Sequence, residues 1–243
     1  YFEDGFSFQT GTGGAALAVT RFLREKMVQK GIRARFALGG ITGAMVKLHE
    51  EGLIGRLLDV QDFDLEAADS VRRNPGHVAI SGHQYAGPGP EGSAVEELDM
   101  VVLSALEIDL QFNVNVLTGS DGVIRGAIGG HPDTASGAKL TLVVAPLIRG
   151  RIPTVLERVN TVVTPGETVD ALVTEYGVAV NPMRGDLAAR LNAAGIPLCT
   201  IGELKAMAEA ITGRPAPIEY GEKIVGLVRY RDGSVIDLIR QVK

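Results

Sequence analysis

The feature that most constrains the fold is a repeated alternation of short apolar segments with longer amphipathic ones. Strands are expected at 6–8, 34–38, 57–60 and 77–81, and helices at 15–30, 42–51 and 65–73. Parallel strands need crossover connections long enough to hold a helix, so this alternation is typical of doubly wound sheets. The first third of the chain therefore predicts an α/β fold.

The rest of the chain continues the pattern less regularly. Further strands are expected at 100–103, 113–117, 139–145, 159–163, 171–173 and 177–180, and helices at 186–194 and 201–212. Thr200 followed by Glu203 has the spacing of a capping box. Asp232-Gly233 between two β-branched runs predicts a C-terminal β-hairpin. We expect a single α/β domain over 1–243, with a doubly wound, largely parallel mixed sheet and helices on both faces.

Two local details complete this expectation. The helix at 15–30 should bury one apolar face, made of Leu17, Val19, Phe22, Leu23 and Met27. Segments 39–40, 82–92 and 118–130 are rich in glycine and are expected to be loops.

Composition excludes several classes of function. The 24 basic and 29 acidic residues give a net charge of −5, which argues against a nucleic-acid-binding protein. The single cysteine, Cys199, excludes an intrachain disulfide and a cysteine zinc cluster, and it fits the cytoplasm. We expect no membrane association, since no apolar run approaches the ~20 residues needed to span a bilayer. The chain starts without Met or a signal-peptide layout, so we expect it to belong to a longer protein.

Glycine accounts for 31 of the 243 residues, a share close to double the ~7% average. The glycines gather where strands lead into helices. Gly11, Thr12, Gly13 and Gly14 form the first such turn, whose N–H groups suit a phosphate or a developing oxyanion. The spacing matches neither the dinucleotide fingerprint nor the P-loop, which disfavours a dinucleotide-dependent enzyme. The alternative is a tight turn that serves packing alone.

Two other glycine turns are candidates of the same kind. Gly129, Gly130 and His131 precede Pro132, which suits a first helical turn, so the glycine amides are candidate donors to the oxyanion of an acyl transfer. The alternative is that Asp133 and Thr134 only cap a helix and that His131 is structural. Gly39 and Gly40 form the third turn, for which simple packing is the favoured interpretation.

Polar side chains between these turns suggest acid–base chemistry and anion binding. Glu107 and Asp109 follow a predicted buried strand, where open α/β sheets place their sites. Asn113 and Asn115 are same-face amides suited to a carboxylate or a pantetheine amide. Arg149, with Arg151 beside it, suits a polycarboxylate because a guanidinium binds carboxylate bidentately. The alternative for Glu107 and Asp109 is a solvated or ion-paired couple, and the alternative for Arg149 and Arg151 is surface solvation.

Other catalytic signatures are missing from the sequence. It has no G-x-S-x-G elbow and no H-E-x-x-H motif. Its four histidines are too scattered along the chain to suggest a zinc site, so no metal is expected.

Five longer segments go further than these short motifs. The sequence at 7–15, 36–42, 103–109 with 111–116, 149–153 and 228–237 resembles the citrate lyase alpha chain, in order and from near the first residue to the last. This resemblance implies the second half of a chain made of two CoA-transferase-like halves. It also implies citrate CoA-transferase activity, in which citrate replaces acetate on an acyl-carrier thioester. The carrier would be a gamma chain bearing a CoA-derived prosthetic group, for which acetyl-CoA is a surrogate. A beta chain would cleave the product, and the chains would form an oligomer.

One departure from the family pattern bears on mechanism. Related CoA-transferases place a nucleophilic glutamate on an early strand of the second half, whereas the segment 33–40 has no carboxylate. We therefore expect a carboxylate of citrate to attack the thioester, with Glu107 as the first suspect if an acyl-enzyme forms. Glu107, Gly129, Gly130 and His131 are the predicted catalytic residues. The alternative is a non-catalytic assembly half, whose site is completed elsewhere.

Overall fold

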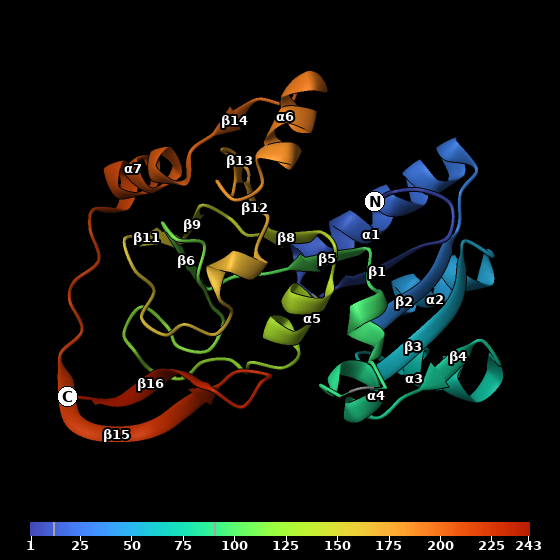
Figure 1. The fold of residues 1–243 in the computed structure, drawn as a ribbon, viewed down its shortest axis with the longest axis horizontal. Helices are drawn as coiled ribbons and strands as arrows, with labels where there is room; N and C mark the ends of the chain where they lie inside the picture. Colours follow the sequence, from blue (N-terminus) through green and yellow to red (C-terminus); the bar gives the residue numbers. More distant parts are fainter. Residues whose placement is uncertain (12, 90) are drawn as a thin grey trace. The chain divides into compact units, whose positions relative to one another are not determined.

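The computed structural model describes residues 1–11, 13–89 and 91–243, which form two compact units. The first unit comprises Tyr1–Leu103 and Asp133–Thr141, and the second comprises Ser104–Pro132 and Leu142–Lys243. Each unit has strands and helices of its own (Figure 1). The single domain expected over 1–243 stays a prediction, because two compact units can still unfold in one cooperative step.

The first unit is built on a parallel sheet in the order β5-β1-β2-β3-β4. Its strands are β1 (Phe6–Thr10), β2 (Ala34–Ile41), β3 (Ile54–Asp62), β4 (His77–Ala79) and β5 (Met100–Leu103). Its helices are α1 (Gly14–Lys30), α2 (Gly43–Glu50), α3 (Leu65–Arg73), α4 (Gly82–Ala86), the 3₁₀ turn η1 (Ala94–Glu97) and most of α5 (His131–Gly137). Each of the first three strands is followed by a helix, as the alternation predicts.

Strand β2 shows that this sheet is covered on both faces. Phe36 and Leu38 point to one face, where they pack against Tyr85 of α4 and against Val95 and Leu98 in and after η1. Ala37 points to the opposite face and is also fully buried. Because successive side chains of a strand alternate between faces, burial of both sets requires cover on both sides.

Helix α1 begins one residue before the predicted start and ends at the predicted residue, but it buries a different face. Thr20, Leu23 and Met27, spaced three and four residues apart, are buried, whereas Leu17 and Phe22 are exposed. The predicted face was wrong for these two residues, because apolar character alone does not show which stripe meets the sheet. The helix ends where predicted, at Gly31 in the left-handed conformation.

Two predicted loops of the first unit are regular structure. Gly39 and Gly40 lie inside β2, not in a loop after it. Residues 82–86 form helix α4, whose capping box joins Ser81 and Gln84. In β2 the glycines accommodate neighbouring side chains and a bulge, whereas in α4 the capping box starts a helix in a segment whose glycines and prolines predicted a loop.

The second unit carries a run of four paired strands, a three-stranded sheet and two hairpins. The run has the order β8-β12-β13-β14, in which β12 and β13 are antiparallel and the other pairs are parallel, and the three-stranded sheet has the order β11-β6-β7. Strands of these sheets are β6 (Glu107–Asp109), β7 (Val114–Asn115), β8 (Thr141–Val144), β11 (Val155–Leu156), β12 (Ala171–Thr174), β13 (Gly177–Val180) and β14 (Leu198–Cys199). The hairpins are β9 (Ile148–Arg149) with β10 (Ile152–Pro153), and β15 (Tyr220–Arg229) with β16 (Val235–Val242). The remaining elements are η2 (Gly166–Thr168), α6 (Gly185–Ala193) and α7 (Ile201–Thr212).

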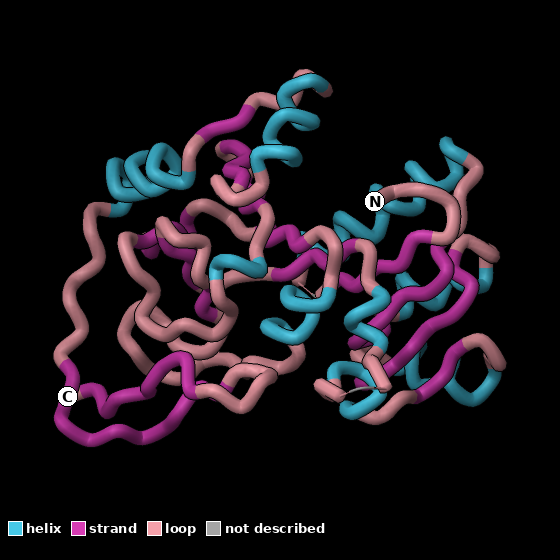
Figure 2. Tube along the Cα trace, viewed as in Figure 1, coloured by secondary structure: helices cyan, strands magenta, loops and turns pink. Residues whose placement is uncertain are grey.

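Loops make up much of the second unit, as Figure 2 shows. The strand predicted at 159–163 is absent from this described segment: Val159 and Val163 are buried, but the N–H of Val159 donates to the Asp109 carboxylate. The capping box at Thr200 and the C-terminal hairpin are confirmed. The largely parallel mixed α/β fold is confirmed as well. Among the described residues, no helix is long and apolar enough to cross a bilayer.

Candidate functional site

Two buried carboxylates lie two positions apart on strand β6 of the second unit. Glu107 and Asp109 are fully buried, and their strand is the central one of the three-stranded β11-β6-β7 sheet. Asn115 Nδ2 donates to Glu107 Oε2 at 2.8 Å, and Asn160 Nδ2 donates to Oε1 at 2.9 Å. Burial raises the pKa of Glu107 and outweighs the opposing effect of these donors. The strand therefore holds a buried carboxylate with both oxygens already hydrogen-bonded.

The side-chain amides of Asn113 and Asn115, which were predicted to bind a ligand, form hydrogen bonds within the second unit. Asn115 is fully buried, and its Oδ1 accepts from the N–H groups of Leu117 and Thr118. Asn113 Nδ2 donates to Asp109 Oδ2 at 3.2 Å, and its Oδ1 accepts from the N–H of Gly166. These contacts tie the β6–β7 turn to neighbouring loops. The role in substrate binding stays a prediction, and the geometry gives both residues a structural task.

Arg149 is the predicted anion-binding residue that keeps an unused donor. It lies at the end of β9, just before Gly150 turns the hairpin in the left-handed conformation. One terminal N–H group donates to the backbone oxygen of Leu106, while the buried Nε has no hydrogen-bond partner among the described residues. Burial lowers the pKa of Arg149, and the nearby Glu107 charge opposes that effect. Buried donors are almost always hydrogen-bonded in native proteins, so this Nε is suited to an added acceptor.

Cavities open beside this network in the second unit. One, of about 270 Å³, is lined by Glu107 and Asn160 together with Arg158 and Arg214. A second, of about 290 Å³, shares Arg158 and Asn160 and adds Arg240. Several guanidinium groups at these openings suit a ligand with more than one carboxylate. Sequence reasoning missed Asn160, Arg158 and Arg214, because they come from loops that carry no recognisable motif.

Arg151 lies two positions after Arg149 and lines a different cavity. It is exposed and lines a cavity of about 490 Å³ that shares Arg214 with the Glu107 cavity. Arg149 is half-buried whereas Arg151 is exposed, so the two arginines lie in different surroundings.

The glycine turns divide into open and packed ones. At Gly11, Gly13, Gly14 and Gly129 an added Cβ would meet nothing within 4 Å, so their backbones are open to a ligand. Thr12, the remaining predicted residue of the first turn, lies outside the described residues. These roles, and that of Gly130, stay predictions.

Gly39 and Gly40 have packing reasons for being glycine. A Cβ on Gly40 would lie 1.7 Å from the Phe63 ring, and one on Gly39 would lie 2.7 Å from the Gln9 side chain. Gly39 also has a positive φ of 98°. Packing therefore accounts for both glycines, which is the interpretation the sequence favoured, and their substrate role is untested.

His131 bridges two segments of the second unit. Its Nδ1 lies 2.6 Å from Thr164 Oγ1, and its Nε2 lies 2.9 Å from the backbone oxygen of Ser104. Burial lowers the pKa of His131 to about 4, so the ring is neutral at pH 7. With both nitrogens engaged, the structure gives His131 a bridging task, and its catalytic role stays a prediction.

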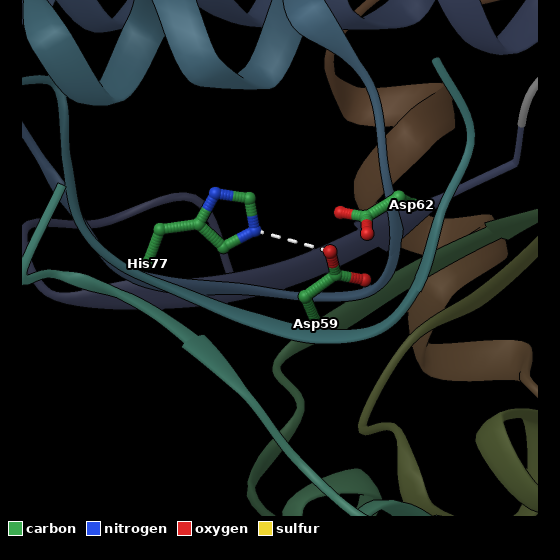
Figure 3. A group of neighbouring side chains, drawn as sticks. All are labelled: Asp59, Asp62 and His77. Carbon is green, nitrogen blue, oxygen red and sulfur yellow. Dashed lines mark hydrogen bonds and ion pairs between the residues drawn. The ribbon is translucent and has the colours of Figure 1, made fainter. Parts of the chain in front are cut away.

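A separate polar cluster lies in the first unit, as Figure 3 shows. His77 Nε2 lies 3.1 Å from Asp59 Oδ2, and Asp62 is the third member. Burial and the neighbouring Asp62 carboxyl raise the pKa of Asp59 to about 7, while burial lowers the pKa of His77. The opposite directions of these shifts favour a hydrogen bond between His77 and Asp59 over a full ion pair.

Comparison with known proteins identifies the family. The family model described as citrate lyase, alpha subunit (CitF), matches residues 1–242. The chain belongs to the citrate lyase alpha-subunit family. Curated citrate lyase alpha chains from Klebsiella pneumoniae, Escherichia coli K12 and Haemophilus influenzae are 64%, 62% and 65% identical to it over 243 residues. These matches cover all of this chain but only 48%, 48% and 49% of the relatives, so the chain spans about half their length.

Solved structures agree with this membership of the citrate lyase alpha-subunit family. A crystal structure described as the alpha subunit of citrate lyase in complex with citrate, from Streptococcus mutans, is 59% identical, with a TM-score of 0.98. That match covers 100% of this chain and 48% of the solved one. RipA from Yersinia pestis is 17% identical over 86% of this chain and 50% of its own, with a TM-score of 0.62. A malonate decarboxylase alpha subunit from Acinetobacter baumannii is 16% identical over 88% and 53%, with a TM-score of 0.59. The last two share the fold alone.

Proposed function

We propose that this chain acts in a citrate CoA-transferase, which exchanges acetate for citrate on an acyl-carrier thioester. The observation that carries the proposal is the buried, unpartnered Nε of Arg149, close enough to Glu107 for the two charges to interact. A carboxylate of citrate would complete the hydrogen bonding of that guanidinium. The citrate complex of the 59%-identical Streptococcus mutans protein supports the same substrate class.

The proposed chemistry needs no nucleophile from this chain. A carboxylate oxygen of citrate attacks the thioester carbonyl carbon, the carbon–sulfur bond breaks, and the thiolate leaves with its electron pair. The thiolate then attacks the citryl carbonyl of the mixed anhydride and expels acetate. Both Glu107 oxygens accept hydrogen bonds from asparagines, which supports a positioning role for Glu107. The open backbone at Gly129, which lies in the same unit as Glu107, is a candidate oxyanion donor.

The thioester would belong to a CoA-derived prosthetic group on a gamma chain, and a beta chain would cleave the citryl product. These partners, the oligomer and a cytoplasmic location follow from family membership as proposals. Glycine amides and arginines supply hydrogen bonds and charge to such a ligand, and acetyl-CoA is the practical surrogate for it.

The direct test measures citryl-CoA formed from acetyl-CoA and citrate, by mass spectrometry. Arg149→Ala should raise the KM for citrate about 10- to 150-fold, because it removes a charged hydrogen bond worth about 1.5–3 kcal/mol. Arg190→Ala, at an exposed position of α6, is the matched control and should leave the kinetics unchanged. Unchanged kinetics for a folded Arg149→Ala protein would remove this arginine from the site.

A second measurement tests the attacking group. Hydroxylamine added during turnover should trap no acyl group on the protein, since citrate supplies the attacking oxygen. A hydroxamate found at Glu107 by peptide mapping would replace this mechanism with an acyl-enzyme.

The alternative is an assembly half without a complete site, and one observation favours it: the segment 33–40 has no carboxylate where related CoA-transferases carry a nucleophilic glutamate. Calorimetry with CoA separates the two. The transferase proposal expects saturable heat from the 243-residue chain, whereas a pure scaffold gives none.

A further inference from the structure

Asp59, Asp62 and His77 of the first unit bring three metal-type ligand atoms within 4.8 Å of one another. The two aspartates come from β3 and the histidine from the neighbouring strand β4. Figure 3 shows all three side chains directed into the same space. The histidine is 15 or more residues away in sequence, so no local motif announces the cluster.

A β-bulge explains how two aspartates three positions apart reach the same side. In a regular strand such residues point to opposite faces. In the pairing with β2, Gly39 faces Asp59, Gly40 faces Gln61 and Ile41 faces Asp62, so β3 carries one extra residue at Val60. The aspartates therefore lie opposite residues only two apart and turn toward one face. Bulges re-aim side chains in this way and occur often beside functional sites.

The donors have the geometry of neighbouring ligands on one ion. His77 Nε2 and Asp59 Oδ2 are 3.1 Å apart, which fits two adjacent bonds of about 2.0–2.2 Å to a shared metal. The other ring nitrogen, Nδ1, lies 2.9 Å from Ser70 Oγ, and such an outer partner commonly orients a metal-binding histidine. Asp59 and His77 are buried while Asp62 is exposed, so an ion can enter past Asp62.

We propose that Asp59, Asp62 and His77 form a binding site for a divalent transition-metal ion of the Zn²⁺ type. Two carboxylates at such close range repel each other when both are ionised, and a bound ion supplies the opposing charge. The imidazole favours Zn²⁺ over Mg²⁺ or Ca²⁺, which prefer all-oxygen sites. Three protein ligands leave a further coordination position for water, and the bound ion cross-links β4, the edge strand of the sheet, to β3.

The test is calorimetric titration of Zn²⁺ into the full 243-residue chain after EDTA treatment and dialysis. We expect one saturable site, no displacement by excess Mg²⁺, and a higher Tm with zinc because binding stabilises the folded state. Asp62→Asn should weaken binding by more than the ~10- to 100-fold that loss of an outer partner costs, and Ser70→Ala should fall within that range. His83→Gln, at an exposed histidine of the same unit, is the control and should bind like the wild type.

Three results would overturn the proposal. These are an absence of saturable zinc binding, equal affinity in the wild type and Asp62→Asn, or an anomalous zinc peak away from His77 in soaked crystals. Because Asp62 is exposed, the Asp62→Asn protein should fold normally. The test therefore stays decisive even if variants of the buried residues Asp59 and His77 do not fold.

Discussion

Changing Asn115 to aspartate should strongly destabilise the second unit, and more so at high pH. Asn115 is fully buried, and its Nδ2 is the donor 2.8 Å from Glu107 Oε2. Asn115→Asp keeps the shape but replaces that donor with an oxygen, so two buried carboxyl groups face each other. Removing one partner from a buried charged contact costs about 3–5 kcal/mol, which is the loss of unfolding free energy we expect near pH 8.

The pH dependence follows from the sign of the pKa shift. Burial already raises the pKa of Glu107, and Asn115 is the largest opposing influence, so its loss raises the folded-state pKa further. A folded-state pKa above the unfolded value gives stability that is present at low pH and is lost as pH rises through the folded pKa. At pH 5 a shared proton joins the two carboxyls, and the loss should shrink to about 1–3 kcal/mol.

The assay is urea denaturation followed by circular dichroism from pH 5 to pH 8.5. Asn192→Asp, an exposed amide near the end of α6, is the matched control, and it should cost at most about 1 kcal/mol because a negative charge lies near a helix C-terminus. A loss below about 1 kcal/mol for Asn115→Asp, or one that does not change with pH, would refute the account of the Glu107 network.

Two more predictions concern packing and titration. Gly166→Ala should destabilise the chain by about 1–3 kcal/mol in urea, because its Cβ would lie 1.8 Å from the backbone oxygen of Gln111. Gly185→Ala, with nothing within 4 Å of the added Cβ, should be neutral or stabilising by up to about 1 kcal/mol, and equal effects would contradict the packing argument. Because the folded-state pKa of His131 is lowered to about 4, its stability contribution is present above the unfolded value of about 6.5 and is lost as pH falls toward 4. His131→Gln should therefore flatten Tm between pH 6.5 and 4, and an unchanged slope would show that other groups cause the acid sensitivity.

Sequence reasoning about the candidate site succeeded for residue types and failed for their partners. It selected Glu107 and Arg149, and the structure places them close enough for their charges to interact. It predicted that Asn113 and Asn115 bind a ligand, whereas these amides donate hydrogen bonds to the two carboxylates of β6. It had no signal for Asn160, because a single polar residue in a loop shows its role only when the chain folds back on β6.

The sequence by itself determined the α/β class, the helix that ends at Gly31, the capping box at Thr200 and the C-terminal hairpin. These features depend on contacts among residues near in the chain, where periodicity, caps and turn residues act directly. Tertiary structure alone decided that Gly40 makes room for Phe63 and that Asp59 and Asp62 share a face with His77. The reason is physical: packing and bulge register depend on atoms brought together from distant parts of the chain, and local sequence does not record that pairing.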